Sequence, residues 1–365
     1  MTQTNSRNYG LDLLKFLSMV YVIIIHTYGS GGILSASQGF SNRIAIAVLC
    51  FATISVDAFA LVTGYASYTD VPKPFNYKRL FDTWIQVFFY GLVITLICYF
   101  VFSGKIDTEA FLRACLPVFY NEYWYFTAYF LVTLLSPLIL TAVRHLSEAS
   151  LKKLIVVTFL IFAVLIPFSF EGYSIVNPFT FAWIFILYFW GAAIRKCHIG
   201  EKISSITLII TIIICAVITF IWNTVLSRVS SHPVIWNNSI LDQYNSPIMV
   251  ISAMCYLILF SRIKIHKIVS RLLYFLAPCL FSAFLINSHP IIYNEVLYER
   301  FVPLAYINPL LAALIVILFS IVFTICSCLI DRLRTILFQL LGINTLIGKI
   351  AALTETIVCS ISKKI

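Results

Sequence analysis

Charged residues are scarce in this chain of 365 residues. Asp, Glu, Lys and Arg together make up 11% of it, whereas hydrophobic residues make up 61% and the mean hydropathy is +0.97. A soluble globular protein has about 25% charged and roughly 45–50% apolar residues. Long apolar runs must satisfy their own backbone hydrogen bonds in a bilayer, which favours helices. The composition therefore predicts an all-α polytopic membrane protein.

Acidic residues are the scarcer of the charged types, with 15 Asp and Glu against 25 Lys and Arg and a formal net charge of +10. The basic residues are scattered between apolar runs rather than gathered in one segment, which argues against a nucleic-acid partner. They are better explained as signals of membrane topology.

Paired cysteines are also missing, because none of the ten cysteines forms a CxxC motif. Most lie in apolar runs, where a free cysteine behaves as a small hydrophobic residue. Neither a disulfide framework nor a metal site is indicated. The N-terminus lacks the clean apolar core of a cleavable signal peptide, since Asp12 and Lys15 interrupt it.

Apolar runs that can cross a bilayer, which takes about 20 residues with some tolerance, number about ten. They cover residues 11–28, 44–65, 84–102, 123–143, 154–170, 179–194, 203–222, 247–260, 272–292 and 309–330. An even number places both termini on one side. Nineteen of the 25 basic residues then fall on that side, five fall on the other, and Lys15 lies within the first run. The positive-inside rule therefore predicts that both termini are cytoplasmic.

Two segments are expected along the chain: a ten-helix membrane domain over residues 7–331 and a cytoplasmic or interfacial tail over residues 332–365. Apolar residues at helical spacing beside basic ones favour an amphipathic helix in the tail. The longest loop, 223–246, is expected on the outer face, where it either contacts a polar acceptor or is simply solvated. Its polar or aromatic side chains of interest are Trp236, Asn237, Asn238 and Asp242.

Ionisable residues within the first apolar run are the most informative feature, because such groups at membrane depth are costly and often functional. Eleven positions separate Lys15 from His26. In a helix both side chains leave from nearly the same face, roughly 16 Å apart, and Asp12, Met19 and Val22 share that stripe. The stripe suggests a path from a cytoplasmic binding zone to a reacting centre. The alternative is a snorkelling lysine and a histidine hydrogen-bonded between helices.

Two further polar groups lie in or beside the next runs. Asp57 in the second run either holds an imidazole in one tautomer, as carboxylates do for catalytic histidines, or bonds a neighbouring hydroxyl. Lys78 and Arg79 directly precede the third run on the cytoplasmic side. Such cations suit phosphate groups, and ordinary positive-inside flanking explains them equally well.

Polar side chains also occur at the fourth and ninth runs. Glu122 precedes a block of aromatic residues that includes Trp124, which an aromatic belt at the membrane interface also accounts for. In the ninth run, His289 is followed by Pro290. A proline-broken helix at membrane depth is tolerated where it lines a cavity, so His289 is a candidate wall residue of the same site as His26.

Taken in order, these segments resemble the membrane-bound acyltransferase-3 family, bacterial O-acyltransferases that decorate cell-surface polysaccharides. The family pattern of a basic residue, ten intervening positions and a histidine is matched by Lys15 and His26. The stretch RNYGLDLLKFLSMVYVIIIHTYGSGG is similar to branches from Gram-positive bacteria. The resemblance covers about residues 7–330, and the other segments that carry it are SVDAFALVTGY, EYWYFTAYFLVTLLSPLI, LYFWGAAIRK and INSHPII.

One departure concerns the third span, where many members carry two arginines three positions apart. Here Arg79 is followed by Asp82, and Lys78 is the residue expected to supply the missing charge. The resemblance implies that the CoA phosphates bind among Lys15, Lys78 and Arg79.

The resemblance implies transfer of an acetyl or other small acyl group from cytoplasmic acyl-CoA to a hydroxyl of a cell-surface or lipid-linked polysaccharide. Acetyl-CoA would be a donor substrate rather than a tightly bound cofactor, and no metal is expected. The expected location is the bacterial plasma membrane, as a multi-pass protein.

Site roles follow from the same resemblance. His26 is expected to act as a general base or as an acylated nucleophile, with Asp57 orienting or polarising the site. The acceptor-side candidates are Glu122, Trp124 and His289.

The alternative from another class is a secondary transporter or a flippase of a polysaccharide precursor. Its proton or substrate path would consist of Asp12, Lys15, Asp57 and His26. No internal repeat is visible, which counts against a transporter built from related halves. Release of free thiol from acetyl-CoA distinguishes the two classes.

Overall fold

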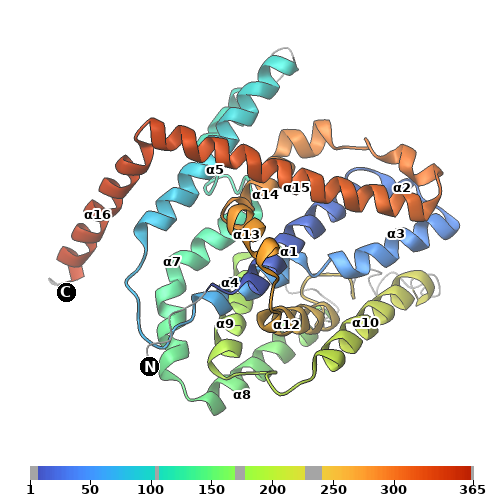
Figure 1. The fold of residues 1–365 in the computed structure, drawn as a ribbon, viewed down its shortest axis with the longest axis horizontal. Coiled ribbons are helices and arrows are strands. Elements are labelled where there is room, and N and C mark those ends of the chain that lie inside the picture. Colours follow the sequence, from blue (N-terminus) through green and yellow to red (C-terminus); the bar gives the residue numbers. More distant parts are fainter. Residues whose placement is uncertain (1–6, 103–106, 169–176, 227–240, 363–365) are drawn as a thin grey trace.

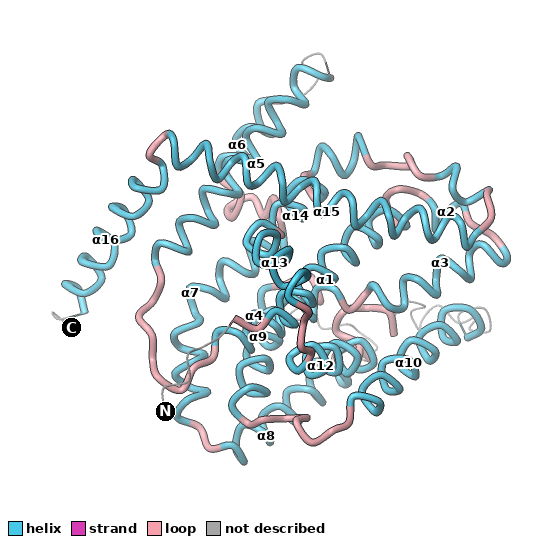
Figure 2. The backbone as a smooth tube through the Cα atoms, in the orientation of Figure 1, coloured by secondary structure: helices cyan, strands magenta, loops and turns pink. Residues whose placement is uncertain are grey.

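Helices are the only regular elements in the part of the chain that this computed structural model describes, residues 7–102, 107–168, 177–226 and 241–362 (Figures 1 and 2). The predicted all-α class is confirmed. The α-helices are α1 (Tyr9–Tyr28), α2 (Ile33–Ala36), α3 (Gly39–Ala52), α4 (Ser55–Ser67), α5 (Tyr77–Val101), α6 (Thr108–Cys115), α7 (Trp124–His145), α8 (Glu148–Phe159), α9 (Phe181–Lys196), α10 (Ser205–Ile221), α12 (Pro247–Arg262), α13 (Lys267–Leu276), α14 (Phe281–Asn287), α15 (Pro309–Leu340) and α16 (Ile343–Ser362).

Seven helical stretches within the described residues are long and apolar enough to cross a membrane, and a bent pair, Lys267–Cys279 with Phe281–Asn287, makes an eighth. Six of the seven correspond to expected runs, and the seventh is Ile343–Ile361 in the tail. The expected runs 179–194 and 247–260 are the 16-residue helices α9 and α12. The run 154–170 forms α8 and a π-helical turn, Leu160–Leu165, and extends beyond the described residues. The count of ten stays a prediction.

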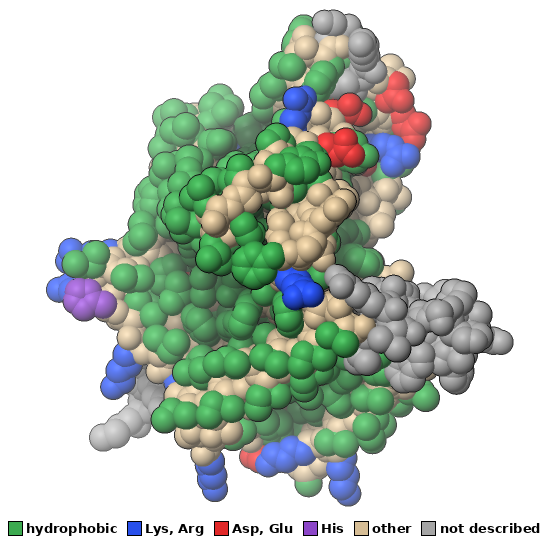
Figure 3. Space-filling model, turned by 90° about the vertical axis from the view of Figure 1, so that its right-hand side faces the viewer, with side chains coloured by type: hydrophobic (Ala, Val, Ile, Leu, Met, Phe, Trp, Pro, Cys, Tyr) green, Lys and Arg blue, Asp and Glu red, His purple; other side chains and the backbone are tan. Residues whose placement is uncertain are grey.

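The outer surface matches a membrane protein. On the face drawn in Figure 3, hydrophobic side chains cover most of the area, and acidic side chains lie mostly near the top, with a little acidic surface at the bottom edge. Large apolar side chains on α10 and α15, among them Ile206, Leu310 and Val322, are more than half exposed. An exposed apolar surface of this breadth requires a covering medium, and for long apolar helices that medium is lipid.

The first turns of the key helices are fixed by asparagine caps. Asn8 accepts hydrogen bonds from the backbone N–H groups of Gly10 and Leu11 at the start of α1. Asn76 accepts one from the N–H of Arg79 at the start of α5. An asparagine at this position satisfies backbone donors that have no partner inside the helix. The caps explain why α1 begins just before Asp12, and why Lys78 and Arg79 occupy the first turn of α5.

Two glycines let α4 and α9 cross in close contact. A methyl group added at Gly64 would lie 2.0 Å from the carbonyl oxygen of Tyr188, and one added at Gly191 would lie 2.1 Å from that of Leu61. Small residues at such crossings allow the helix backbones to approach. This contact places Asp57 of α4 against Trp183 of α9, where the indole Nε1 donates to the carboxylate Oδ1 at 3.0 Å.

The ninth expected run is broken in two places. Its first part, α13, is bent by 50° against α14 at a 3₁₀ turn, Ala277–Cys279, that contains Pro278. Its second part, α14, ends at Asn287, and the chain resumes at Pro290 and enters a π-helical turn, Ile292–Val296. The interruption expected at Pro290 is therefore observed. It presents Asn287 and Ser288 toward the centre of the bundle, where both contact or line the site described below.

The expected boundary between residues 331 and 332 does not coincide with the end of a helix. α15 continues to Leu340 because its interior, after Pro309 in the first turn, contains neither Gly nor Pro. The chain then turns at Gly342, which has a positive φ of 70°, a conformation that glycine adopts without strain. α16 follows and packs against α5, and Figure 1 shows it at one edge of the molecule.

Candidate active site

A cavity of about 690 Å³ opens between the N-terminal ends of α1 and α5 and the C-terminal end of α15. We call it the cationic cavity, because five of its lining residues are basic: Arg7, Lys15, Lys78, Arg79 and Arg334. A cavity of this volume is in the range of small-molecule and cofactor sites.

Three of these cations have carboxylate partners. Arg7 pairs with Asp12 and Lys78 with Asp82 at nitrogen–oxygen distances of 2.6 and 2.7 Å, and Arg334 pairs with Asp331.

Two cations of the same cavity have no carboxylate partner among the described residues. Arg79 donates only a long bond, 3.4 Å, to the Tyr129 hydroxyl, and Lys15 has no ion pair with any described residue. The cavity therefore carries uncompensated positive charge near the N-terminal end of α1. Lys15 is half-buried and Arg79 is exposed, and an anionic ligand in the cavity is the natural partner of such cations.

A second cavity of about 390 Å³ lies farther along α1, and we call it the histidine cavity. It is mostly apolar and aromatic, and its rings include Trp124, Phe179, Tyr244 and Phe284. Met19, Val22 and His26 line it from α1, whereas Asp12 and Lys15 of the same helical stripe line the cationic cavity. One helix face thus connects a cation-rich chamber with an imidazole.

The orientation of His26 is set by α14 and the π-helical turn. Its Nδ1 is hydrogen-bonded to the side-chain oxygen of Asn287, and its ring meets the ring of Tyr293 edge-on, with 5.0 Å between centroids. An amide oxygen can only accept, so Nδ1 carries the proton. Nε2 therefore keeps its lone pair, as a general base requires.

The two cavities share two aromatic residues. Phe59 of α4 and Tyr125 of α7 line both chambers, and their rings pack edge to face with centroids 6.0 Å apart. We call this ring pair the aromatic partition. A group that reaches from one chamber to a reacting atom in the other must pass beside it.

Unpartnered hydroxyls lie around the histidine cavity. The side-chain oxygens of Ser55, Tyr125 and Ser288 are buried, have no hydrogen-bond partner among the described residues, and belong to residues that line this cavity. The large majority of buried side-chain polar atoms in proteins have a hydrogen-bond partner. Three orphaned hydroxyls around one chamber therefore indicate that a polar ligand completes them.

A third cavity of about 500 Å³ adjoins the histidine cavity and shares Ile25, Phe179 and Tyr244 with it. Asp242, which the sequence left open as either an acceptor contact or part of a solvated loop, is one of its lining residues, and burial raises the pKa of that carboxyl to about 6. Trp236, Asn237 and Asn238 of the same loop lie outside the described residues.

Asp57 and His26 do not meet. Asp57 is fully buried, accepts from Trp183 through Oδ1, and has no partner for Oδ2 among the described residues. Its neighbours Ser55 and Val56 line the histidine cavity, but Asp57 does not. The structure gives the role of orienting the imidazole to Asn287 instead.

The three acceptor-side candidates, Glu122, Trp124 and His289, lie in different parts of the structure. Trp124 lines the histidine cavity. His289 turns toward α5, where its Nε2 lies 3.3 Å from the Gly91 carbonyl oxygen and 3.3 Å from the Thr95 hydroxyl. Because its Nδ1 accepts from the backbone N–H of Ile291, Nε2 carries the proton and both nitrogens are occupied.

Glu122 lines a separate cavity of about 430 Å³ together with Arg113, and its carboxylate lies 3.9 Å from that guanidinium. Burial raises the pKa of this carboxyl above its usual value, and Arg113 opposes the shift. Trp124 is therefore the one of the three acceptor-side candidates that the structure brings to His26.

A protein-family comparison decides the class of this site. A family model described as an acyltransferase domain matches residues 8–332, which is most of the chain. The chain belongs to the acyltransferase-3 family. No curated protein and no solved structure matches it. The chain is accordingly a membrane acyltransferase, and the transporter alternative is not retained.

Several residues of this acyltransferase site were not identified from the sequence. Asn287 belongs to the INSHPII segment that carries the resemblance, but its contact with His26, across 261 positions of sequence, depends on the fold. Tyr125 is one of four aromatic residues in a row, so only the fold shows which ring borders both chambers. Arg334 was assigned to the amphipathic tail. A signal for it existed, since Asp331 three positions earlier is an acidic residue in an otherwise apolar helix.

No group of three or more His, Cys, Asp or Glu side chains suited to a metal ion occurs within the described ranges. The basic side chains that line the cationic cavity favour an anionic ligand.

Proposed function

We propose that this acyltransferase moves an acetyl or other small acyl group from cytoplasmic acyl-CoA to a hydroxyl of a cell-surface or lipid-linked polysaccharide. The donor enters the cationic cavity, and the acceptor hydroxyl enters the histidine cavity. The termini and the cationic cavity face the cytoplasm of a bacterial cell in this proposal, in agreement with the distribution of basic residues along the sequence.

The observation that carries the proposal is the junction of the two cavities at the aromatic partition. Lys15 and Arg79 offer uncompensated positive charge on one side, and His26 offers an imidazole with a free Nε2 on the other. Arginine and lysine suit the phosphates of CoA, and the flexible pantetheine arm brings the thioester to the partition.

The reaction needs a base and a donor for the developing oxyanion. The acceptor hydroxyl gives its proton to Nε2 of His26 while its oxygen attacks the thioester carbonyl carbon. The carbon–sulfur bond then breaks, and the proton passes from the imidazolium to the leaving thiolate. The Tyr125 hydroxyl, unpartnered at the junction, donates to the carbonyl oxygen as negative charge develops there.

The acceptor side is built for an uncharged ligand with hydroxyl groups. Trp124, Phe179 and Tyr244 supply aromatic surface, and Ser55 and Ser288 supply unpartnered hydroxyls. A mostly apolar lining with a few placed polar groups is typical of binding pockets that orient a ligand. A sugar ring, with apolar faces and polar edges, has matching chemistry.

Donor turnover tests the proposal with the purified full-length protein. We expect release of free thiol from acetyl-CoA, faster when an acceptor glycan is present. Lys15→Ala and Arg79→Ala should each raise the KM for acetyl-CoA, because a lost charge-assisted contact costs about 1.5–3 kcal/mol, or roughly 10- to 150-fold.

Lys153→Ala is the matched control, because this lysine is exposed on α8 and does not line the cationic cavity. It should leave the KM unchanged. Absence of thiol release with every acceptor glycan offered would contradict the donor assignment. An unchanged KM in both test variants would mean that these two cations serve topology or packing only.

A further inference from the structure

The segment that follows residue 332, which the family match does not reach, forms one wall of the cationic cavity. The last turns of α15 contribute Arg334, Thr335 and Phe338 to the lining. Beyond the turn at Gly342, α16 contributes Asn344 and Ile347. The tail therefore reaches the same chamber as Lys15 and Arg79, which lie on α1 and α5.

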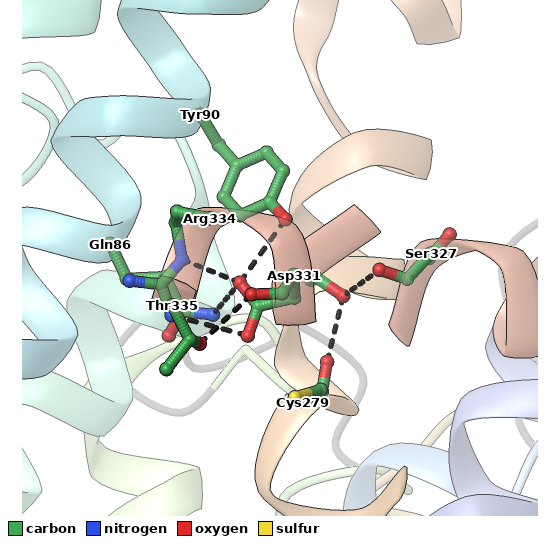
Figure 4. Close-up of polar contacts among 8 residues, drawn as sticks. Gln86, Tyr90, Cys279, Ser327, Asp331, Arg334 and Thr335 are labelled. Carbon is green, nitrogen blue, oxygen red and sulfur yellow. Dashed lines mark hydrogen bonds and ion pairs between the residues drawn. The ribbon is translucent and has the colours of Figure 1, made fainter. Parts of the chain in front are cut away.

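Arg334 is the charged group of this wall, and its position is fixed from several sides (Figure 4). Its Nε and Nη2 donate to the two oxygens of Asp331 at 2.6 and 3.1 Å. Asp331 is 1% exposed and also accepts from Gln86 Nε2 at 3.0 Å and from the Tyr90 hydroxyl at 3.1 Å, both on α5. The guanidinium also lies over the ring of Phe338, 4.8 Å from its centroid.

This arrangement leaves one edge of the guanidinium available. Nη1 of Arg334 makes no hydrogen bond within the described part of the chain, and the side chain is 13% exposed where it lines the cavity. The carboxylate of Asp331 is already shared among donors from two helices. An arginine oriented by a buried carboxylate presents its remaining N–H donors in a fixed direction. Such donors favour hydrogen bonds to a phosphate group.

A purely structural ion pair within α15, with its carboxylate hydrogen-bonded to α5, would not need this opening. Arg332, two positions earlier, shows what such a contact looks like: it donates to the Phe275 carbonyl oxygen, stacks on the Phe275 ring, and does not line the cavity. The two arginines therefore differ in whether a ligand can reach them.

We propose that Arg334 binds a phosphate group of acyl-CoA, with Asp331, Gln86 and Tyr90 as positioning residues, and that α16 closes this side of the donor cavity. The proposal rests on the proposed function, because it assigns a partner to a cavity in which acyl-CoA is the donor. It adds the C-terminal helices to the donor site.

The test compares two donors, acetyl-CoA and S-acetyl-pantetheine, which carries the thioester but no phosphate ester. Arg334→Gln should raise the KM for acetyl-CoA about tenfold or more, the range for a lost charge-assisted hydrogen bond. The KM for S-acetyl-pantetheine should not change. A variant that merely loosened the helices would impair both donors alike. Acetyl-dephospho-CoA then shows whether the 3′-phosphate or the pyrophosphate is the group recognised.

Matched variants complete the experiment. Arg332→Gln on the same helix should behave as the wild type with both donors. Asn344→Asp on α16 should raise the KM for acetyl-CoA by repulsion of the phosphates, whereas Asn344→Ser, which adds no charge, should have a smaller effect. Because Asn344 is half-buried at the start of α16, both substitutions keep the fold and remain informative if Arg334→Gln fails to fold.

The outcomes separate this proposal from the proposed function. A wild-type protein that releases no thiol from acetyl-CoA removes the proposed function and this inference together. An active wild type combined with an unchanged KM in Arg334→Gln and Asn344→Asp removes this inference alone. Equal losses with acetyl-CoA and S-acetyl-pantetheine would show that Arg334 only holds Asp331 in its contacts with α5.

Discussion

At the scale of the residue, His26 is the group on which the chemistry depends. Its partner Asn287 sets the tautomer without supplying a charge, so the imidazole gains orientation but not the electrostatic support that a carboxylate gives. His26→Gln keeps polar volume and hydrogen bonding but cannot take up a proton. We expect turnover to fall by roughly 10²–10⁴-fold, measured as acetyl transfer by the purified variant.

Folding must be retained for that result to report on chemistry. The His26→Gln protein should insert, purify and melt close to the wild type. Near wild-type transfer would make His26 a structural residue. Because both nitrogens of His289 are occupied in its contacts with α5 and the Ile291 N–H, that residue is not a ready substitute.

The hydroxyl of Tyr125 offers a second test, because its loss has opposite effects on activity and on stability. Tyr125→Phe should lower kcat about 10²-fold, the lower end of the range for one lost oxyanion donor. Stability should stay equal or rise, since the hydroxyl is buried without a partner and such a group is costly to desolvate.

Tyr123→Phe is the matched control for this test. Its hydroxyl is also buried and unpartnered, but Tyr123 lines neither cavity. We expect that substitution to leave kcat unchanged. Equal kcat values in the two phenylalanine variants would place the oxyanion donor elsewhere.

The raised pKa of Asp242 predicts that the free energy of unfolding depends on pH. Its folded pKa is about 6 against an ordinary value of 3.8, so the folded protein holds this proton more tightly than the unfolded chain. Stability therefore falls as pH rises from about 4 through about 6 and then levels off. Asp242→Asn should remove this fall and be more stable than the wild type by roughly 2 kcal/mol near neutral pH, after allowance for solvent screening.

Thermal unfolding of the purified protein at about pH 4.5 and about pH 7.5 measures this difference, which should be present mainly at the higher pH. An equal difference at both pH values would show that the carboxyl titrates normally. Cys50 lines the same cavity, and Cys50→Ala is a control that should not alter the pH profile.

At the scale of the element, the crossing of α4 and α9 is the contact least tolerant of change. Gly64→Ala would place a methyl group 2.0 Å from the Tyr188 backbone oxygen, and neither helix can yield at a backbone atom without separating. We expect a loss of about 1–3 kcal/mol or more and a lower yield of folded protein after detergent extraction.

Gly348→Ala on α16 is the control for this prediction. Nothing lies within 4 Å of a methyl group there, so the better helix propensity of alanine should leave the protein unchanged or slightly more stable. Similar melting temperatures for the two variants would contradict the close crossing of α4 and α9.

Features that lie within one helix could be predicted from the sequence, whereas contacts between helices could not. Helical periodicity is a local property, so the stripe that joins Lys15 to His26 could be read directly, and the structure places its members along the two cavities. The interruption at Pro290 was equally local. The contact between His26 and Asn287 was not, because it depends on how two distant helices pack.

Helix number was harder to predict for a physical reason. α9 is largely buried among other helices, with Trp183 and Trp190 fully buried, so it faces protein rather than lipid and needs no full hydrophobic length. The pairing of Asp57 with Trp183 rather than with an imidazole also follows from this packing. Charge patterns along the sequence carry no information about such contacts.

At the scale of the whole molecule, the orientation in the membrane is the testable claim. In a variant without native cysteines, single cysteines at Lys153 and Lys267 should react with an impermeant thiol reagent only after cells are opened. Cysteines at Arg43 and Arg300 should react in intact cells. All four positions are exposed, so access depends on the side of the membrane alone, and the reverse pattern would remove the cytoplasmic entry of acyl-CoA.

The aromatic partition has a consequence for energy coupling. In the proposed reaction, the proton of the acceptor hydroxyl enters His26 from one chamber and leaves on the thiol in the other, on opposite sides of the rings of Phe59 and Tyr125. With the acceptor outside and CoA inside, the proton and the negative charge of the acceptor oxygen both pass inward to the sulfur, so each turnover moves no net charge. A net charge carried across the membrane would change the energy by about 2.3 kcal/mol per 100 mV. Acyl transfer in sealed vesicles should therefore be electroneutral, with the same rate of thiol release at inside-negative and inside-positive potentials, and a rate that followed the potential would contradict this exchange.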